Sequence, residues 1–311
     1  MVVMAVTATW VVGSLNIDLV AQVPRFPQPG ETIRGSGFAT FLGGKGGNQA
    51  MSLCRLGAAP HMVGRVGDDQ FGRRYRSALL EAGGNTDHVR PVEGETTGTA
   101  VIEVDAEGQN HIVIVPGANG FMTAEAVLAE IDDISAGDIM LLQLEIPFDT
   151  VWAVAKRANA RGATVILDPA PAAEIPADAL AAMSWVTPNE HEASIITGVD
   201  TGTEAGLHRA CRALLEAGVN HAVVKAGKRG AVYADQDDPH PQLIPGYSVE
   251  AVDTTAAGDS FNGGLAWALG RRLHPLEAVR HANAVAALSV TGMGAQTAMP
   301  TADEVFQFMN P

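Results

Sequence analysis

Lysine, cysteine and aromatic residues are all scarce in this chain of 311 residues. It contains four lysines, two cysteines and 5% aromatic residues, and its formal net charge is -15. The acidic balance argues against nucleic acid or an anionic membrane as a partner. Cys54 and Cys211 form neither a disulfide framework nor a metal-ligand spacing, so we expect a reducing, cytoplasmic location.

Long apolar runs are also lacking. No window reaches the roughly 18 uncharged apolar residues that a membrane span requires, so we expect a soluble protein. Residues 1–12 are apolar, but they lack a basic leader and a convincing cleavage site, and this predicts a first strand rather than a signal peptide. With 47% hydrophobic and 18% charged residues, the composition is that of an ordinary globular protein.

Apolar runs of strand length alternate with longer amphipathic segments. The pattern predicts buried strands at 10–13, 61–64, 139–144, 164–168, 185–187 and 222–225. It predicts helices at 47–56, 71–82, 123–131, 150–161, 190–197, 204–217, 260–271, 275–290 and 301–308. This order indicates an α/β fold, with a doubly wound, mainly parallel sheet and helices on both faces.

Two regions break the alternation. Residues 21–41 are rich in proline and glycine, and residues 97–116 contain two short apolar runs around a turn. Both are typical of short strands, and we expect them to meet as a small antiparallel sheet that covers a site as a lid. Because no repeat or low-complexity stretch is visible, we expect one domain over residues 1–311 with two lid insertions.

The segment 253–259 delivers an acidic residue through a small-residue turn into an apolar helix. Such a turn leaves the backbone N–H groups of Ala256, Ala257, Gly258 and Asp259 free to face an anion. Asp259 lies among the same donors, so it should stay ionised at neutral pH and accept a proton from a hydroxyl group. The alternative is a glycine turn in which Asp259 only caps the helix.

Two further polar clusters suit a polyhydroxylated ligand. In residues 43–48, glycines permit close approach while Lys45 and Asn48 supply donors; the spacing is not that of a Walker loop. In residues 13–18, Asn16 and Asp18 share one face at the end of the first strand, where α/β sheets bind ligands. The alternatives are a structural glycine turn and an Asx turn.

The last two motifs follow later strands. Asn189 and Glu192 share a helix face and could organise the water shell of a phosphate-bound Mg²⁺, or they form an ordinary capping box. Residues 225–230 place cations and glycines at a strand end, which suits a border of nucleotide phosphates or simply a basic turn.

These clusters, together with residues 116–119 and Glu145, occur in the order and spacing of the ribokinase family of PfkB-type carbohydrate kinases, which the chain resembles from Val11 to about Pro300. The resemblance implies transfer of the γ-phosphoryl group of ATP to a primary hydroxyl, with O5 of D-ribose as the expected acceptor. ATP, Mg²⁺ and K⁺ are the implied cofactors, and a homodimer formed through the lid is the implied assembly.

The resemblance also implies roles for individual positions. The catalytic group comprises Asp259 as base and the anion hole of Ala256, Ala257 and Gly258. The sugar-binding set is Asn16, Asp18, Gly43, Gly44, Lys45, Asn48 and Glu145. The nucleotide and phosphate set is Asn189, Glu192, Lys225, Gly227, Gly230 and Asn283, with Glu192 reaching Mg²⁺ through water. The monovalent-cation set is Asp253, Thr255, Ser289, Gly292, Gly294 and Ala298.

Two of these positions depart from the family pattern. Ala298 replaces a common serine, and Lys225 stands where threonine is common.

Fructose, another sugar or a nucleoside remain alternative acceptors, although a nucleoside would need aromatic surface and the lid offers only Phe38 and Phe41. A non-catalytic sugar sensor would not need Asp259 or the pair Asn189 and Glu192. A dehydrogenase would need a glycine fingerprint after the first strand, which is lacking.

Overall fold

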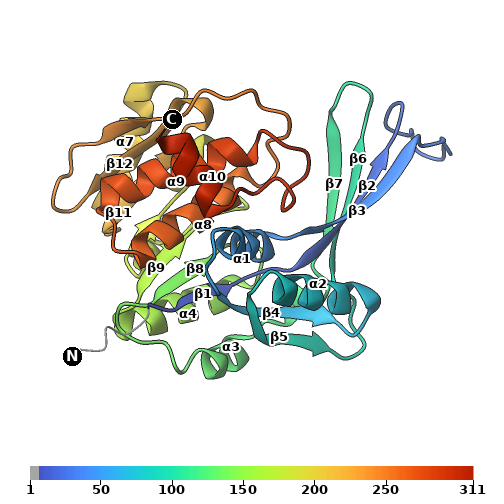
Figure 1. The fold of residues 1–311 in the computed structure, drawn as a ribbon, viewed down its shortest axis with the longest axis horizontal. Coiled ribbons are helices and arrows are strands. Elements are labelled where there is room, and N and C mark those ends of the chain that lie inside the picture. Colours follow the sequence, from blue (N-terminus) through green and yellow to red (C-terminus); the bar gives the residue numbers. More distant parts are fainter. Residues whose placement is uncertain (1–6, 311) are drawn as a thin grey trace.

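The computed structural model describes residues 7–310. The predicted first strand therefore lies partly outside the described residues, and its described portion is β1, Thr9–Val12. Figure 1 shows an α/β body with a narrow sheet that rises beside α1 and α2.

The body is built on a nine-stranded sheet with the order β13-β12-β11-β10-β9-β8-β1-β4-β5. The strands from β11 to β5 in this order run parallel, and β12 and β13 are antiparallel additions at one edge. Besides β1, the strands are β4 His61–Gly67, β5 Asn85–Val92, β8 Ile139–Leu142, β9 Thr164–Leu167, β10 Trp185–Val186, β11 His221–Lys225, β12 Gly230–Asp235 and β13 Gln242–Pro245.

Helices cover both faces of this sheet because successive strand residues point to opposite sides. Trp10 and Val12 enter one hydrophobic core and Val11 enters the other. The first core includes α3 Ala124–Glu130, α4 Phe148–Ala160, α5 Ala177–Leu180, α6 Glu190–Thr197 and α7 Glu204–Glu216. The second includes α1 Lys45–Arg55, α2 Gln70–Glu81, α8 Ala257–Gly270 and α9 Pro275–Ser289, and α10 Ala302–Met309 packs on α9.

The predicted lid exists as a separate four-stranded sheet. Its order is β3-β2-β6-β7, formed by β2 Asn16–Gln22, β3 Gly37–Gly43, β6 Gly98–Val104 and β7 Asn110–Val115. The outer pairs are antiparallel as expected, but the central pair of β2 and β6 is parallel. Both strands lead away from the carboxyl ends of parallel strands of the body, β1 and β5, so they run in the same direction.

The boundaries of the first lid insertion also differ from the prediction. β2 begins at Asn16, before residue 21, and residues 23–36 contain no strand. The sequence pattern likewise missed β5, β12, β13 and α5. β5 is an edge strand in which polar residues interrupt the apolar alternation, and α5 is only four residues long.

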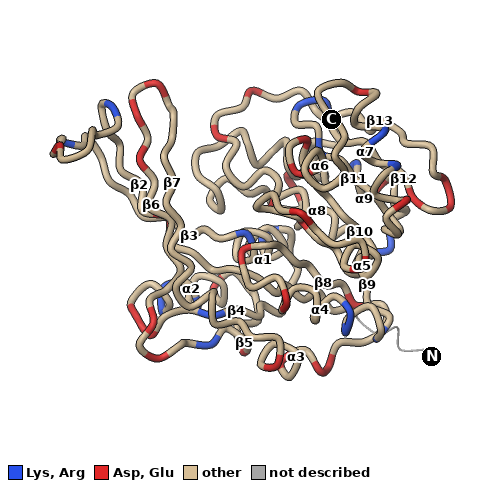
Figure 2. Tube along the Cα trace, turned by 180° about the vertical axis from the view of Figure 1, so that it is seen from behind, with Lys and Arg blue, Asp and Glu red and all other residues tan. Residues whose placement is uncertain are grey.

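Charge is spread over the molecule. Figure 2 shows acidic and basic residues interspersed along the chain rather than gathered into one basic surface. Both cysteines are free and buried. No described helix has the length and apolar character that crossing a bilayer requires.

Candidate active site

The turn before α8 places backbone donors on the lining of a cleft. Ala256 has a φ of 59°, in the left-handed region, and this bends the chain sharply into the helix. Among the described residues the amides of Ala256, Gly258 and Asp259 have no hydrogen-bond acceptor. The amide of Ala257, which we also expected to be free, donates to the carbonyl of Thr254 at 3.3 Å because the turn closes on itself.

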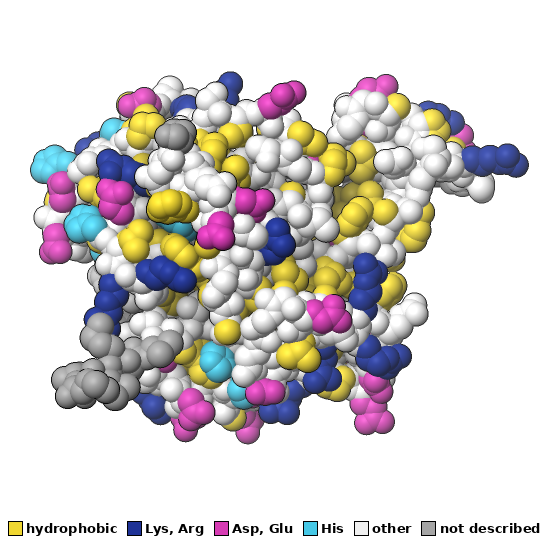
Figure 3. All heavy atoms as spheres, viewed as in Figure 1, with side chains coloured by type: hydrophobic (Ala, Val, Ile, Leu, Met, Phe, Trp, Pro, Cys, Tyr) yellow, Lys and Arg dark blue, Asp and Glu magenta, His cyan; other side chains and the backbone are white. Residues whose placement is uncertain are grey.

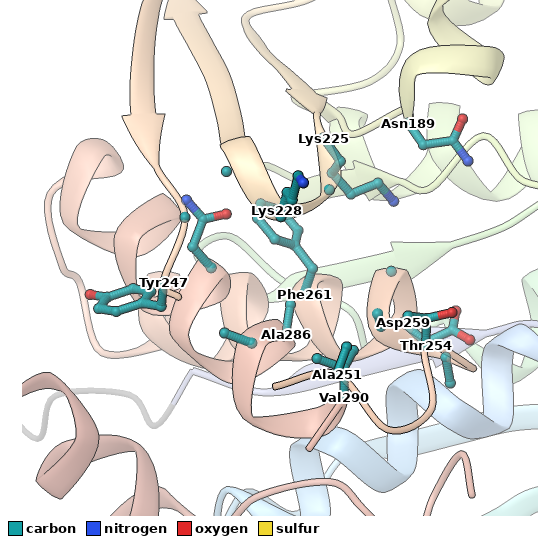
Figure 4. Close-up of a pocket in the computed structure, with 18 of the residues that line it drawn as sticks. Asn189, Lys225, Lys228, Tyr247, Ala251, Thr254, Asp259, Phe261, Ala286 and Val290 are labelled. Atoms are coloured by element: carbon teal, nitrogen blue, oxygen red, sulfur yellow. The ribbon is translucent and has the colours of Figure 1, made fainter. Parts of the chain in front are cut away.

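The cleft has a volume of about 740 Å³ and its lining includes Asp259 and all three residues of this turn. In Figure 4, Asp259 lies on the opposite side of the cleft from Asn189, and the Lys225 side chain extends into the cleft between them. A helix N-terminus with unpaired amides binds anions well. The cleft is therefore a place where a phosphate group would be stabilised.

Asp259 is a buried carboxylate held by two side-chain amides. Its two oxygens accept from Nδ2 of Asn48 at 2.9 Å and from Nε2 of Gln49 at 3.2 Å. Burial raises the pKa of Asp259 to about 6, against the attraction of Lys45, while Asp168 raises it further. A carboxylate with this pKa is ionised at neutral pH and is a stronger base than an exposed one.

Lys45 begins α1 and lines the same cleft. Burial by itself lowers the pKa of Lys45, but the carboxylates around it, Asp259 and Asp168 foremost, raise the pKa above its ordinary value. The side chain therefore stays cationic. Its backbone N–H donates to Oε2 of Glu145 at 3.0 Å, so Glu145 fixes the start of α1.

The sugar-set residues lie where β2 and β3 leave the body. Asn16 and Glu145 line a second cavity of about 360 Å³, together with Asn119, whose Nδ2 donates to Oδ1 of Asn16 at 2.7 Å. Gly44 has a φ of 81°, and a Cβ atom there would lie 2.7 Å from the backbone nitrogen of Asn16. Only glycine permits this approach.

Asp18 lies against Gly43 in the neighbouring strand, since Asp18 pairs with Phe41 and a Cβ atom on Gly43 would overlap the Asp18 carboxylate. Burial, assisted by the charge of Glu145, raises the pKa of Asp18 to about 6. Two carboxylates near each other favour a ligand that donates hydrogen bonds and carries no negative charge.

The nucleotide-set residues Asn189, Glu192, Lys225, Gly227, Gly230 and Asn283 all line the large cleft. The capping box of Asn189 and Glu192 is present: each side chain accepts from the backbone N–H of the other. Burial raises the pKa of Glu192. Asn283 donates to the carbonyl of Ile244 at 3.2 Å, which ties α9 to β13 at the rim.

The cation-set segments also come together. Asp253 accepts from the amide of Thr255 at 2.9 Å and from the amide of Gly294 at 3.0 Å. Gly292 lies beside Ala298, since a Cβ atom on Gly292 would be 3.2 Å from the Cβ of Ala298. Within the described residues no three His, Cys, Asp or Glu side chains converge as a metal cluster.

Sequence reasoning missed two residues that the structure places at the centre of the site. Nε2 of Gln49 is 3.1 Å from Oδ2 of Asp168, and it also contacts Asp259. Gln49 accepts from Gln143 at 2.7 Å, which fixes its amide so that its nitrogen faces both carboxylates. Asp168 immediately follows β9, and the rule that ligands bind at carboxyl ends of strands could have found it.

The chain is similar to known sugar kinases over almost its whole length. The chain is 41% identical over 300 residues to the ribokinase of Bacillus subtilis, covering 96% of this chain and 98% of that protein. It is 33% identical to the deoxyribokinase of Salmonella typhi over 302 residues, with 96% and 98% covered. The structure of Arabidopsis thaliana ribokinase complexed with ribose and ATP matches with a TM-score of 0.89 and 34% identity, covering 98% of this chain and 99% of that one.

A cleft with free amides at a helix tip, a buried carboxylate beside them and these relatives define an ATP-dependent carbohydrate kinase. The family model described as pfkB family carbohydrate kinase matches residues 7–302, and the chain belongs to this family.

Proposed function

We propose that this protein is a ribokinase that transfers the γ-phosphoryl group of ATP to O5 of D-ribose. The observation that carries the proposal is the buried carboxylate of Asp259 beside the unpaired amides of Ala256 and Gly258, in one cleft with Lys45. A proton acceptor and an anion-binding site are thereby held on the same turn.

The reaction is a direct in-line transfer. The sugar O5 loses its proton to Asp259 and forms a bond to the γ-phosphorus, while the bond from that phosphorus to the bridging oxygen of ADP breaks. The amides before α8 stabilise the charge on the equatorial oxygens. The lid strands exclude water, which would otherwise compete as the acceptor.

Exposed Asn189 and buried Glu192, both on the cleft lining, fit a hydrated magnesium ion next to phosphate, since the shell of Mg²⁺ consists mostly of water and carboxylate oxygens. Bound there with the nucleotide, Mg²⁺ supplies neutralisation of phosphate charge. Glu192 already serves its own helix cap, so its part is to accept hydrogen bonds from the water shell.

On the sugar side, Asn16, Asp18, Lys45, Asn48 and Glu145 supply donors and acceptors for hydroxyl groups, with Gly43 and Gly44 leaving room for the ring. The alternatives are 2-deoxyribose, fructose, another sugar or a nucleoside. A nucleoside is disfavoured because the lid phenylalanines, Phe38 and Phe41, are 68% and 39% exposed and do not form a stacking pocket.

An acceptor panel tests the proposal. Release of ADP is measured with ribose, 2-deoxyribose, fructose and adenosine, each with MgATP. We expect ribose to give the highest kcat/KM. A different preferred acceptor would overturn the ribose assignment but keep the kinase, and no ADP release with any acceptor would favour a non-catalytic sensor.

The activity should fall in acid. Because the pKa of Asp259 is about 6, the base becomes protonated below that pH, and we expect kcat/KM for ribose to decline at least tenfold per pH unit as the pH falls. Sugar binding should weaken over the same pH range, since Asp18 also has a pKa of about 6 and loses its charge there. Measuring kcat/KM for ribose across the acid and neutral range checks this, because kcat/KM reports on the ionisable groups of the free enzyme.

Asp253 is proposed as part of a monovalent-cation site with carbonyl groups of Thr255, Ser289, Gly292 and Gly294. Burial raises its pKa, but hydrogen bonds from Thr255 and Gly294 outweigh burial and lower it, so the carboxylate is anionic. Backbone carbonyl oxygens replace the hydration shell of K⁺ well, so several carbonyls with one carboxylate suit this ion, although Ala298 contributes no side-chain oxygen. Bound K⁺ would supply positive charge near the anion hole.

We expect the activity to drop when potassium is replaced by a large organic cation, and Asp253→Ala to abolish this dependence. Initial rates with potassium, sodium and choline salts at constant ionic strength provide the test. Equal rates in all three salts for the unmodified enzyme would remove the cation assignment.

The chain is further proposed to act as a single kinase domain and as a homodimer paired through the lid. Exposed apolar residues lie along β7, and Figure 3 shows hydrophobic side chains gathered on the lid. Such patches usually mark an interface. Sedimentation of the unmodified enzyme and of the Ile112→Lys variant measures whether the dimer forms.

Two buried free thiols support a cytoplasmic location.

A further inference from the structure

A buried ion pair lies in the wall of the large cleft. Nζ of Lys225, at the end of β11, is 2.8 Å from Oδ1 of Asp168, which follows β9. The Asp168 side chain is 2% exposed and that of Lys225 is 13% exposed. The second oxygen of Asp168 accepts a hydrogen bond from Gln49, so the aspartate is held from two sides. The ammonium group of Lys225, in contrast, is carried by a flexible four-carbon side chain.

The lysine head borders the anion-binding turn. A Cβ atom placed on Gly258 would lie 3.3 Å from Nζ of Lys225, and the amide of Gly258 is one of those without an acceptor. Both residues line the cleft, and Figure 4 shows the Lys225 side chain extending into it. An ammonium group has three N–H donors, and the bond to Asp168 uses one of them.

We propose that Lys225 binds the terminal phosphates of the nucleotide and that Asp168 is a positioning residue that holds the lysine until the nucleotide arrives. The inference rests on the proposed kinase function. A triphosphate carries more charge than one carboxylate, so its oxygens compete successfully for the ammonium group. Where related enzymes commonly place threonine, this chain places a longer cationic side chain with its own buried counter-ion.

The pair has a different role from Lys45. The charge of Lys45 is shared among four carboxylates, Asp259, Asp168, Glu145 and Glu192, whereas Lys225 forms a direct salt bridge of 2.8 Å to Asp168. Lys228, also on the cleft lining, lies in the turn of residues 227–229 at the rim. Lys225 is therefore the cation that can move between a protein carboxylate and phosphate oxygens beside Gly258.

Titration calorimetry with a non-hydrolysable ATP analogue plus Mg²⁺, and separately with AMP, tests the exchange. We expect Lys225→Met to weaken binding of the analogue by roughly 10-fold to 100-fold, the value of a hydrogen bond to a charged group. AMP binding should change by less than about 2-fold, since AMP lacks the terminal phosphates. Lys156→Met is the matched control: Lys156 lies over the ring of Trp152, away from the cleft, and should change neither affinity.

Asp168→Asn should change the affinity for the analogue in the opposite direction. Without the competing carboxylate, Lys225 is free for phosphate, so binding of the analogue should tighten several-fold; in a Lys225→Met background the same change should have no effect. The double variant holds no lone buried charge. If Lys225→Met alone fails to fold, comparing Asp168→Asn with the double variant measures the same loss.

Three outcomes would overturn the exchange and show that the ion pair is structural. Lys225→Met could weaken binding of the analogue and of AMP equally, or it could weaken neither. Asp168→Asn could weaken binding of the analogue instead of tightening it. If the unmodified enzyme binds the analogue and the variants give one of these outcomes, only this inference fails. An unmodified enzyme that does not bind the analogue fails the proposed function itself.

Discussion

Replacing Asp259 with asparagine should lower kcat by roughly 10² to 10⁴ while leaving ribose binding largely intact. Asparagine keeps the shape of the side chain, but it cannot accept the proton of O5. Binding should survive because the sugar contacts are assigned to other residues. Steady-state kinetics with MgATP, together with ribose binding measured by calorimetry, separates the two effects.

A matched control is available in another helix. Asp303 is an acidic residue in the first turn of α10, as Asp259 is in the first turn of α8, but it is exposed. Asp303→Asn removes the same charge from the first turn of another helix and should leave kcat unchanged. Turnover of Asp259→Asn close to that of this control would remove the base from the mechanism.

Asp18→Ala should raise the KM for ribose and reduce kcat/KM by about 10²-fold, with little change in the KM for ATP. Hydrogen bonds from hydroxyls to an ionised carboxylate are worth about 1.5–3 kcal/mol, and their loss leaves sugar hydroxyls unpaired in a closed site. Initial rates with each substrate varied in turn measure the effect.

Two glycines of β3 sharpen this test. Gly43→Ala introduces a methyl group that overlaps the Asp18 carboxylate, so it should reproduce the rise in ribose KM without removing the charge. Gly37→Ala lies in the same strand, where the new methyl group would meet the movable end of Gln22 at 2.9 Å, and it should have little effect. A change in the KM for ATP instead of ribose would contradict the assignment of Asp18 to the sugar.

The regular elements could be predicted because their signals are local. Apolar runs and amphipathic periods gave β1, β4, β8, β9, β10 and β11 and the helices from α1 to α10 except α5. The signals failed where an element is short or at an edge, as in α5 and β5, since there burial imposes no clear period. The parallel pairing of β2 with β6 depends on how both strands leave the body, which no residue pattern records.

The sequence by itself determined the α/β class, the family and the polar motifs at the strand and helix ends, because each is written in residues that are neighbours along the chain. Only the tertiary structure decided which groups share the centre of the site. Gln49 meets Asp168 and Asp259, which are 119 and 210 residues away, and Lys225 meets Asp168 at a separation of 57. Residues so far apart along the chain meet only when the parallel strands bring their carboxyl ends to one edge of the sheet. That packing sets the proton affinity of Asp259.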